Sequence, residues 1–171
     1  MKKETFCKYI RQYETDMFRF AKSIVGNQAD GEDAMQESIL KAYEKIDTLR
    51  SRRKFKAWIF QILANECYQI LRNRQRQELT DPFEFSKQDS EYDHLTADTN
   101  IENGEILSYI SKIPKQYQEV LILYYYDEFS TKEIAKILDI PQGTVKSRLA
   151  RGRKQLRDLL EMEGEGAYEG I

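Results

Sequence analysis

Hydrophobic residues recur along most of this chain at every third or fourth position, which is the spacing of one face of an α-helix. In the first half the pattern predicts helices over residues 5–25, 32–46 and 55–76, with a break at 26–31. In the second half it predicts helices over 101–112, 114–127, 131–138 and 144–160. No stretch sustains the alternation typical of a strand, so the predicted fold class is all-α.

A polar stretch at residues 79–100 separates the two sets of helices. It contains Pro82, several Ser, Thr and Asp residues and no helical period, which favours a flexible linker over a long loop within one domain. We therefore expect two small helical domains at 1–78 and 101–162, joined by an acidic linker at 79–100 and followed by an acidic tail at 163–171. A chain of 171 residues is long enough for this arrangement.

The net charge of −2 conceals a strong segregation of charge along the chain. Residues 50–76 are rich in Lys and Arg and contain Glu66 as their single acid, whereas residues 78–105 are rich in acids and contain Lys87 as their single cation. A partner responds to the local field, within a Debye length of about 10 Å at moderate salt. The basic segment is therefore a candidate surface for nucleic acid despite the negative total.

Several classes of function find no support in the sequence. Cys7, Cys67 and His94 give too few ligands for a structural zinc site or a disulfide framework, so we expect no metal and no cofactor. The chain has no Gly-rich phosphate loop, and its Asp and Glu residues are predicted to lie exposed to solvent and not in a catalytic site. We therefore expect no enzymatic activity. The start lacks the apolar run of a signal peptide, and the longest apolar run, 120–126, is far below the roughly 20 residues that span a bilayer. We therefore expect a cytoplasmic protein without membrane insertion.

The helix pair over residues 131–160 is the most informative pattern. Ser130 and Glu133 fit a capping box, and residues 139–143 include the Pro and Gly that end one helix and begin another. One side of the second helix is apolar, made by Val145, Leu149, Gly152, Leu156, Leu159 and Leu160. The opposite side and its flanks carry Lys146, Ser147, Arg148, Arg151, Arg153, Lys154 and Arg157. The cationic side could simply be a solvated basic face without a partner. The capping box, the turn and the outward cations occur together, however, and this combination favours a helix-turn-helix that binds the major groove of DNA.

A polar strip interrupts the mostly apolar helix predicted over residues 55–76. It is made by Trp58, Gln61, Asn65, Gln69 and Arg72. A flat ring, amides and a cation are the groups that handle unpaired bases, and stacking of one base on a ring contributes about 1–3 kcal/mol. A Trp half-buried at the edge of a core is the alternative. Cations directly before the strip favour single-stranded nucleic acid; they are Arg50, Arg52, Arg53, Lys54 and Lys56.

The helix over residues 32–46 carries a candidate surface for a protein partner. Its core face is predicted at Met35, Ile39, Ala42, Tyr43 and Ile46. The opposite side then exposes Leu40 among acids. A single exposed leucine is ordinary in a folded protein, but beside Asp33, Gln36 and Glu37 it predicts a docking patch for a basic partner.

The order of these features resembles that of bacterial sigma factors, and more narrowly of the extracytoplasmic-function (ECF) group, which keeps only regions 2 and 4 of the larger sigma factors. The resemblance covers nearly all of residues 6–160 apart from the linker. It is carried by three segments in the family's order: DAMQESILKAY at 33–43, FKAWIFQILAN at 55–65 and GTVKSRLARGR at 143–153. It implies a region 2-like helical bundle followed by a region 4-like helix-turn-helix.

The resemblance also implies roles for single residues. The first segment would dock on the beta-prime coiled coil of core RNA polymerase through Asp33, Gln36, Glu37 and Leu40. The second segment and the loop before it would capture the melted minus-ten strand through Arg50, Ser51, Arg52, Trp58, Asn65 and Gln69. The third would read the minus-thirty-five duplex through Thr144, Lys146, Ser147, Ala150 and Arg151. Implied partners are promoter DNA, the beta and beta-prime subunits of core polymerase, and an anti-sigma factor.

A conventional transcription regulator is the main alternative, because the helix-turn-helix at 131–147 also resembles that of response regulators. Such a regulator binds duplex DNA without joining polymerase as a sigma subunit. The first half of the chain has no phosphoacceptor or ligand-domain pattern, and it carries the two other sigma segments. Promoter-specific initiation as a sigma factor is therefore the predicted function.

Overall fold

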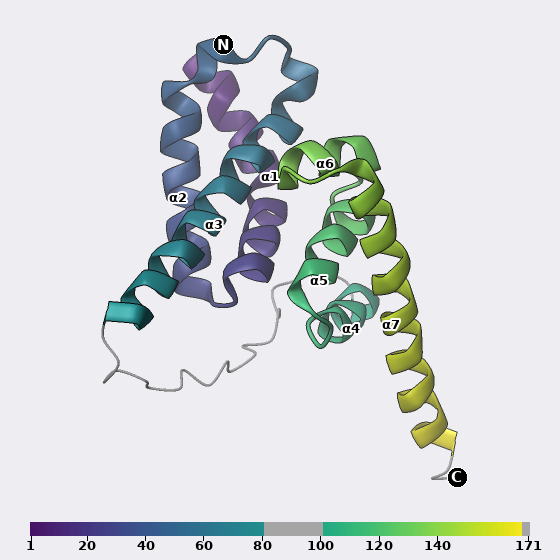
Figure 1. Ribbon diagram of the computed structural model, residues 1–171. Coiled ribbons are helices and arrows are strands. Elements are labelled where there is room, and N and C mark those ends of the chain that lie inside the picture. Colours follow the sequence, from purple (N-terminus) through teal and green to yellow (C-terminus); the bar gives the residue numbers. More distant parts are fainter. Residues whose placement is uncertain (81–100, 169–171) are drawn as a thin grey trace. The chain divides into compact units, whose positions relative to one another are not determined.

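The computed structural model describes residues 1–80 and 101–168, with side chains over 1–79 and 104–164 (Figure 1). All regular structure in these ranges is helical, which confirms the predicted all-α class. The chain separates into two compact units, one containing α1, α2 and α3 and the other containing α4, α5, η3, α7 and most of α6. The predicted linker at 79–100 lies outside the described residues except for Leu79 and Thr80, which continue α3, so the domain limits stay a prediction.

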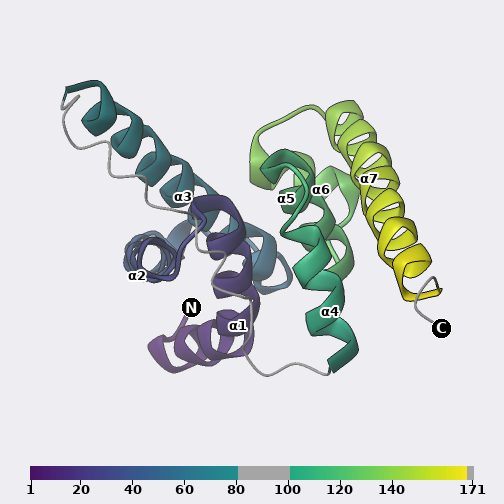
Figure 2. The same cartoon turned by 90° about the horizontal axis from the view of Figure 1, so that it is seen from below.

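The first unit is a bundle of three helices. They are α1 (Lys3–Val25), α2 (Gln28–Glu44) and α3 (Phe55–Thr80), with the short 3-10 turns η1 (Ile46–Thr48) and η2 (Arg52–Lys54) between the last two. Figure 2 looks almost along α2 and shows α1 and α3 beside it. The aromatic core includes Phe20 of α1 and Phe60 of α3, both fully buried, with their ring centroids 5.5 Å apart.

The junction between α1 and α2 is shorter than the predicted break at residues 26–31. Gly26 lies in the left-handed region at φ 85°, and its N–H donates to the Lys22 carbonyl at 2.8 Å, which ends α1. Asn27 then caps α2 by accepting the Asp30 N–H at 2.9 Å. One glycine and one capping asparagine are enough to separate two helices, so Gly31 is a buried helical residue and not part of a loop.

The core face of α2 differs from the predicted one. The buried positions are Gly31, Ala34, Ser38 and Ala42, whereas Tyr43 is 47% exposed. These small side chains let α2 approach α1 and α3 closely. The buried Ser38 hydroxyl has its hydrogen bond within the helix, because it donates to the Met35 carbonyl at 2.7 Å. The larger Met35, Ile39 and Ile46, which hydrophobicity alone assigns to the core, are only partly buried.

The second unit contains α4 (Ile101–Ile110), α5 (Lys115–Leu121), η3 (Ile122–Tyr126), α7 (Gln142–Tyr168) and the first five residues of α6 (Thr131–Leu138). The helix predicted over 114–127 is present, but its second part, η3, is a π-helical turn. The core of the second unit includes Val120, Leu121 and Leu123 together with Val145 and Leu149 of α7. Gly152 brings α7 close to α5, because a Cβ at this position would lie 3.1 Å from Leu121 Cδ1.

The last helix continues past its predicted end at residue 160. α7 runs to Tyr168, so residues 163–168 of the predicted acidic tail are helical, and 169–171 lie outside the described part. Glu163 accepts a hydrogen bond from Lys112 Nζ at 2.7 Å and another from the Tyr109 hydroxyl. The hydrogen bond from Lys112 and, to a smaller extent, the one from Tyr109 hold the pKa of the Glu163 carboxyl below its ordinary value. They join the last turns of α7 to the end of α4.

We expect Gly152→Val to destabilise the second unit, because its Cβ alone would lie 3.1–3.3 Å from side-chain atoms of Leu121 and Tyr117. Overpacking of this kind lowers the free energy of unfolding by about 1–3 kcal/mol. Thermal unfolding followed by far-UV circular dichroism measures the loss. Gly143→Ala is the matched control, since its Cβ meets nothing within 4 Å and the change should be neutral or stabilising. Equal melting temperatures for the two variants would contradict the packing described.

Candidate nucleic-acid and partner interfaces

The start of α6 is fixed by the predicted capping box. The Glu133 carboxylate accepts hydrogen bonds from the Ser130 N–H and the Ser130 hydroxyl, both at 2.9 Å, and the Glu133 N–H donates to Ser130 Oγ at 3.2 Å. The helix ends at Leu138, and Asp139 after it takes the left-handed φ of 53°, while the Ile140 N–H donates to the Ala135 carbonyl at 3.0 Å. Both ends of α6 are therefore specified locally, which confirms the predicted helix-turn-helix.

The faces of α7 agree with the predicted division. Val145, Leu149 and Gly152 are buried, although Leu160, predicted on the same side, is 41% exposed because the unit's core does not extend that far along the helix. The exposed candidates for duplex contact are Lys146, Ser147, Ala150, Arg151 and Lys154, and the partly exposed ones are Thr144 and Arg148. A polar and cationic helix face of this kind is suited to a major groove with phosphates on both sides.

The polar strip on α3 remains accessible in the structure. Gln61, Asn65 and Arg72 are exposed, while Trp58 and Gln69 are half-buried. Their spacing of three or four residues places them along one face of the helix. Asn65 leaves an amide available to unpaired bases. The Trp58 ring is half-buried and lies 5.9 Å from the ring of the buried Phe55, so it stands at the edge of the core with only part of its surface accessible.

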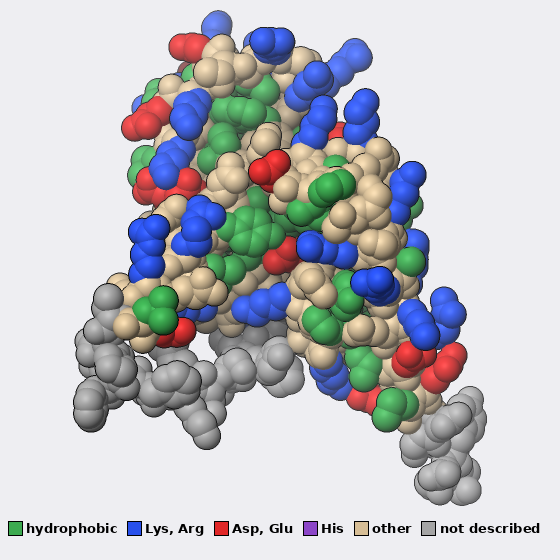
Figure 3. All heavy atoms as spheres, in the orientation of Figure 1, with side chains coloured by type: hydrophobic (Ala, Val, Ile, Leu, Met, Phe, Trp, Pro, Cys, Tyr) green, Lys and Arg blue, Asp and Glu red, His purple; other side chains and the backbone are tan. Residues whose placement is uncertain are grey.

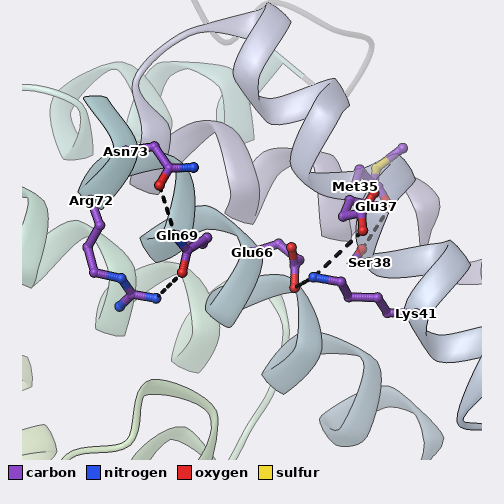
Figure 4. Close-up of polar contacts among 8 residues, drawn as sticks. All are labelled: Met35, Glu37, Ser38, Lys41, Glu66, Gln69, Arg72 and Asn73. Atoms are coloured by element: carbon purple, nitrogen blue, oxygen red, sulfur yellow. Dashed lines mark hydrogen bonds and ion pairs between the residues drawn. The ribbon is translucent and has the colours of Figure 1, made fainter. Parts of the chain in front are cut away.

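Gln69 is held in position by its neighbours on α3 (Figure 4). Its Oε1 accepts from Arg72 Nη2 at 2.9 Å, and its Nε2 donates to Asn73 Oδ1 at 2.9 Å. Asn73 did not figure in the sequence-based prediction, although its spacing of four residues from Gln69 was a usable signal. A preoriented amide has less freedom to lose when it binds a base edge.

The loop before α3 supplies cations close to the beginning of the strip. Arg50 and Arg52 are exposed, and Ser51 is half-buried at the start of η2. Figure 3 shows Lys and Arg side chains gathered over this loop. Lys56 lies elsewhere: its Nζ is 3.8 Å from Asp16 Oδ2 of α1 and 5.5 Å from the centre of the Tyr13 ring. The structure therefore places Lys56 against α1 and not in line with the strip.

The predicted docking patch is exposed on α2. Asp33, Gln36 and Glu37 are exposed, and Leu40 is 62% exposed. Glu37 Oε1 lies 3.6 Å from Lys41 Nζ, which also donates to Glu66 Oε1 of α3 at 2.7 Å. The hydrogen bond to Glu66 is the main reason that the pKa of Lys41 is raised above its ordinary value.

Comparison with known proteins identifies the family. The family model described as "Sigma-70 region 2" matches residues 9–77, and the one described as "Sigma-70, region 4" matches residues 103–156. The chain is 32% identical over 170 residues to the ECF RNA polymerase sigma factor SigW of Bacillus subtilis strain 168, covering 91% of each chain. It is 30% identical over 156 residues to SigM of the same organism, covering 91% of this chain and 94% of SigM.

The chain belongs to the ECF group of sigma factors. Among solved structures, this sigma factor is similar to RpoE of Bartonella quintana in complex with the anti-sigma factor NepR, with a TM-score of 0.75 and 26% identity over 92% of this chain and 98% of that one. It shares the fold of CnrH, solved in complex with the cytosolic domain of CnrY, with a TM-score of 0.64 and 22% identity over 94% and 90% of the two chains.

Metal ligands and membrane spans were the other candidate features in the part of this sigma factor that the structure describes. Within residues 1–79 and 104–164 no group of His, Cys, Asp and Glu is arranged to hold a metal ion. Cys67 is buried, as expected of a small apolar side chain, whereas Cys7 is exposed and His94 lies outside the described residues. None of the described helices is both long and apolar enough to cross a membrane.

We expect Ser130→Ala to loosen the start of α6, because it removes the hydroxyl that accepts the Glu133 N–H. Loss of an N-cap side chain lowers stability by about 1 kcal/mol. Denaturant unfolding measures the change. Ser147→Ala is the control, since the exposed Ser147 hydroxyl donates to the Thr144 carbonyl within α7 and alanine favours the helix. If Ser130 caps α6, the denaturant midpoint of unfolding falls in Ser130→Ala and stays unchanged in Ser147→Ala; equal midpoints for the two variants would contradict this role.

Proposed function

We propose that this sigma factor joins core RNA polymerase and directs it to promoters by reading a closed minus-thirty-five duplex with α7 and holding unpaired minus-ten bases on α3. One observation carries the proposal: a single chain has an exposed cationic helix-turn-helix face and, on a separate helix, a strip that combines the exposed Gln61 and Asn65 with the half-buried Trp58. The first chemistry suits duplex and the second suits unstacked bases. A regulator that binds duplex alone does not need the second.

The duplex function is supported by the geometry of the helix-turn-helix. The capping box and the left-handed turn at Asp139 fix both ends of α6, and the buried Val145 and Leu149 fix the rotation of α7. Arg151 is then turned outward at the middle of the exposed face. Arginine pairs bidentately with guanine in the major groove, while neighbouring Lys and Arg side chains contact phosphate.

The single-strand function is supported by the strip on α3. Unpairing and flipping a base is unfavourable by a few kcal/mol. Stacking on Trp58 returns about 1–3 kcal/mol for one base, and amide contacts from Asn65 and Gln69 add hydrogen bonds to base edges. Arg50 and Arg52 are exposed in the loop just before α3, where they can neutralise phosphates of a strand bound along the strip. Trapping bases in this way stabilises an opened promoter without any catalytic step by this chain.

The polymerase contact is proposed for the exposed face of α2. Leu40 is largely exposed and is accompanied by Asp33, Gln36 and Glu37. An apolar anchor with an acidic rim suits a basic protein surface, and the family resemblance suggests the coiled coil of the beta-prime subunit, with further contacts to the beta subunit. Because RNA polymerase is the proposed partner, we place the protein's action in the cytoplasm.

An anti-sigma factor is a further proposed partner. The structural relative RpoE was solved in complex with the anti-sigma factor NepR, and it aligns with nearly all of this chain. We infer that a comparable inhibitor holds this sigma factor inactive by covering the surfaces that contact polymerase. Co-purification of such a protein with the chain from its host would support this inference.

Run-off transcription tests the proposed function. Purified core RNA polymerase is supplied with a promoter library, with and without this protein. We expect a subset of promoters to be transcribed only in its presence, and we expect permanganate reactivity to reveal unpaired thymines in their minus-ten elements. Duplex binding without transcription would favour the conventional regulator, and transcription that never depends on the protein would exclude the sigma role.

We predict that Arg151→Ala weakens binding by about 1–3 kcal/mol at promoters that carry the preferred base, and by much less where that base is replaced. The matched control is Lys154→Ala, where loss of a phosphate contact should weaken all sequences equally and reduce the salt slope by about 1. Affinities of duplex oligonucleotides at several salt concentrations give both quantities. A loss at Arg151 that is the same for every base would assign this residue to phosphate.

A further inference from the structure

A second group of cations lies where the start of α1 meets the loop before α3. Phe6 of α1 and Phe55 of α3 are both buried, with their ring centroids 5.9 Å apart. Phe6 stands one turn after the start of α1, and Phe55 directly follows η2. The first turn of α1 and the turn η2 are therefore neighbours, and Figure 1 shows both at the same end of the first unit.

The cations at this end outnumber the acids. Residues 1–8 carry three cations and one acid, and residues 50–54 carry four cations and no acid. Arg50 and Arg52 are already proposed to serve the strip on α3. The remaining cations, which we call the end patch, are all exposed; they are Lys2, Lys3 and Lys8 at the start of α1 and Arg53 and Lys54 in η2.

The end patch differs from the rest of the first unit in how its charges are balanced. Elsewhere in this unit a carboxylate accompanies a cation, as Asp16 does Lys56 at 3.8 Å and Glu66 does Lys41 at 2.7 Å. In the part of the chain that the structure describes, no ion pair joins a cation of the end patch to an acid. Cations gathered on one surface repel each other over a Debye length, about 10 Å at moderate salt. An anionic partner relieves this repulsion when it binds.

The end patch adjoins one end of the polar strip. Trp58, the first residue of the strip, has its ring centroid 5.9 Å from that of Phe55. Tyr9 of α1 stacks on the same Phe55 ring, with the centroids 5.0 Å apart. Phe55 therefore connects the strip to α1. A strand that leaves the strip past Trp58 comes next to the start of α1, whereas Arg72, at the other end of the strip, lies several turns away along α3.

We propose that the end patch binds phosphates of the unpaired promoter strand beyond Trp58, so that α1 takes part in holding the opened DNA. This inference rests on the proposed function and adds to it a surface that contacts the backbone alone. Ammonium and guanidinium groups neutralise phosphates without reading bases. The strip then selects the sequence, while the end patch lengthens the bound segment at one of its ends, whatever bases stand there.

An unpaired strand is the anionic partner that the surroundings of the end patch favour. The patch continues a strip whose ring and amides suit unpaired bases, and a flexible single strand can pass from α3 onto α1 along a cationic surface. Closed duplex is stiff over such a distance. The two forms of DNA are therefore expected to respond differently when the patch is removed.

The test uses the full chain assembled with core polymerase and a minus-ten single-stranded oligonucleotide, with or without a short run of thymidines added at its five-prime or its three-prime end. For the natural protein we expect the run to tighten binding at one end only. The double variant Lys3→Gln, Lys8→Gln should lose most of this gain. Its salt slope on the extended oligonucleotide should fall by about 0.7 for each lost phosphate contact, hence by about 1.4 in all. On the oligonucleotide without the run, the variant should bind like the natural protein.

Two controls accompany the double variant. Lys22→Gln removes the same charge from the last turn of α1, away from the end patch, and should keep the full gain. Replacement of Lys3 and Lys8 by Arg keeps both charges and should also keep it. Because core polymerase is the same in every assembly, differences between variants report the end patch.

Three results would overturn the proposal. They are an unchanged gain and salt slope in the double variant, a natural protein that gains from the run at neither end, and an equal loss on closed duplex carrying the same sequence, which would assign the patch to double-stranded DNA. Failure of the proposed function is recognised separately, because run-off transcription would then be absent with the natural protein.

Discussion

The division of a helix into a buried and an exposed face is the constraint on which both proposed DNA-binding surfaces depend. An α-helix turns once every 3.6 residues or so, so burial of one stripe decides where all its other side chains point. In α3 the buried Ile59 and Leu63 turn Asn65 to the outside, and in α7 the buried Val145 turns Arg151 outward. The cores are thus what aim the functional side chains, and a small sigma factor needs no separate scaffold for them.

Where large apolar residues follow the helical period, the sequence was sufficient to predict the structure. The inward face of α7 is confirmed at Val145, Leu149 and Gly152, and the capping box of α6 is confirmed too, because Leu, Val and a Ser–Glu pair carry strong local preferences. The predicted core face of α2 was wrong except at Ala42, because the small Gly31, Ala34 and Ser38 complete it in place of the larger residues. Hydrophobicity scales favour large side chains, but close packing of three helices favours small ones, and this requirement becomes visible only when the neighbouring helices are present.

Contacts between distant residues could not be predicted at all. Lys41 and Glu66 are separated by 25 positions, and Tyr109 and Glu163 by 54, so no local pattern relates them. The extension of α7 beyond residue 160 was also missed, because the run of Glu and Gly residues at its end was interpreted as an acidic tail. Glutamate is a good helix former, and the bonds from α4 to Glu163 give the last turns of α7 a tertiary anchor. The candidate site residues lie mostly where the sequence placed them, but the interactions that orient them do not follow from it.

The central claim is that α3 holds unpaired strand while α7 holds closed duplex in the same promoter complex. Site-specific photocross-linking tests it most directly, with a photoreactive amino acid at position 65 in one protein and at position 151 in another, each assembled with core polymerase on promoter DNA labelled in either strand. The account predicts that position 65 cross-links only to the non-template strand of the minus-ten element, and position 151 only to the minus-thirty-five duplex. Cross-links from position 65 to both strands of intact duplex, or to no DNA at all, would contradict it.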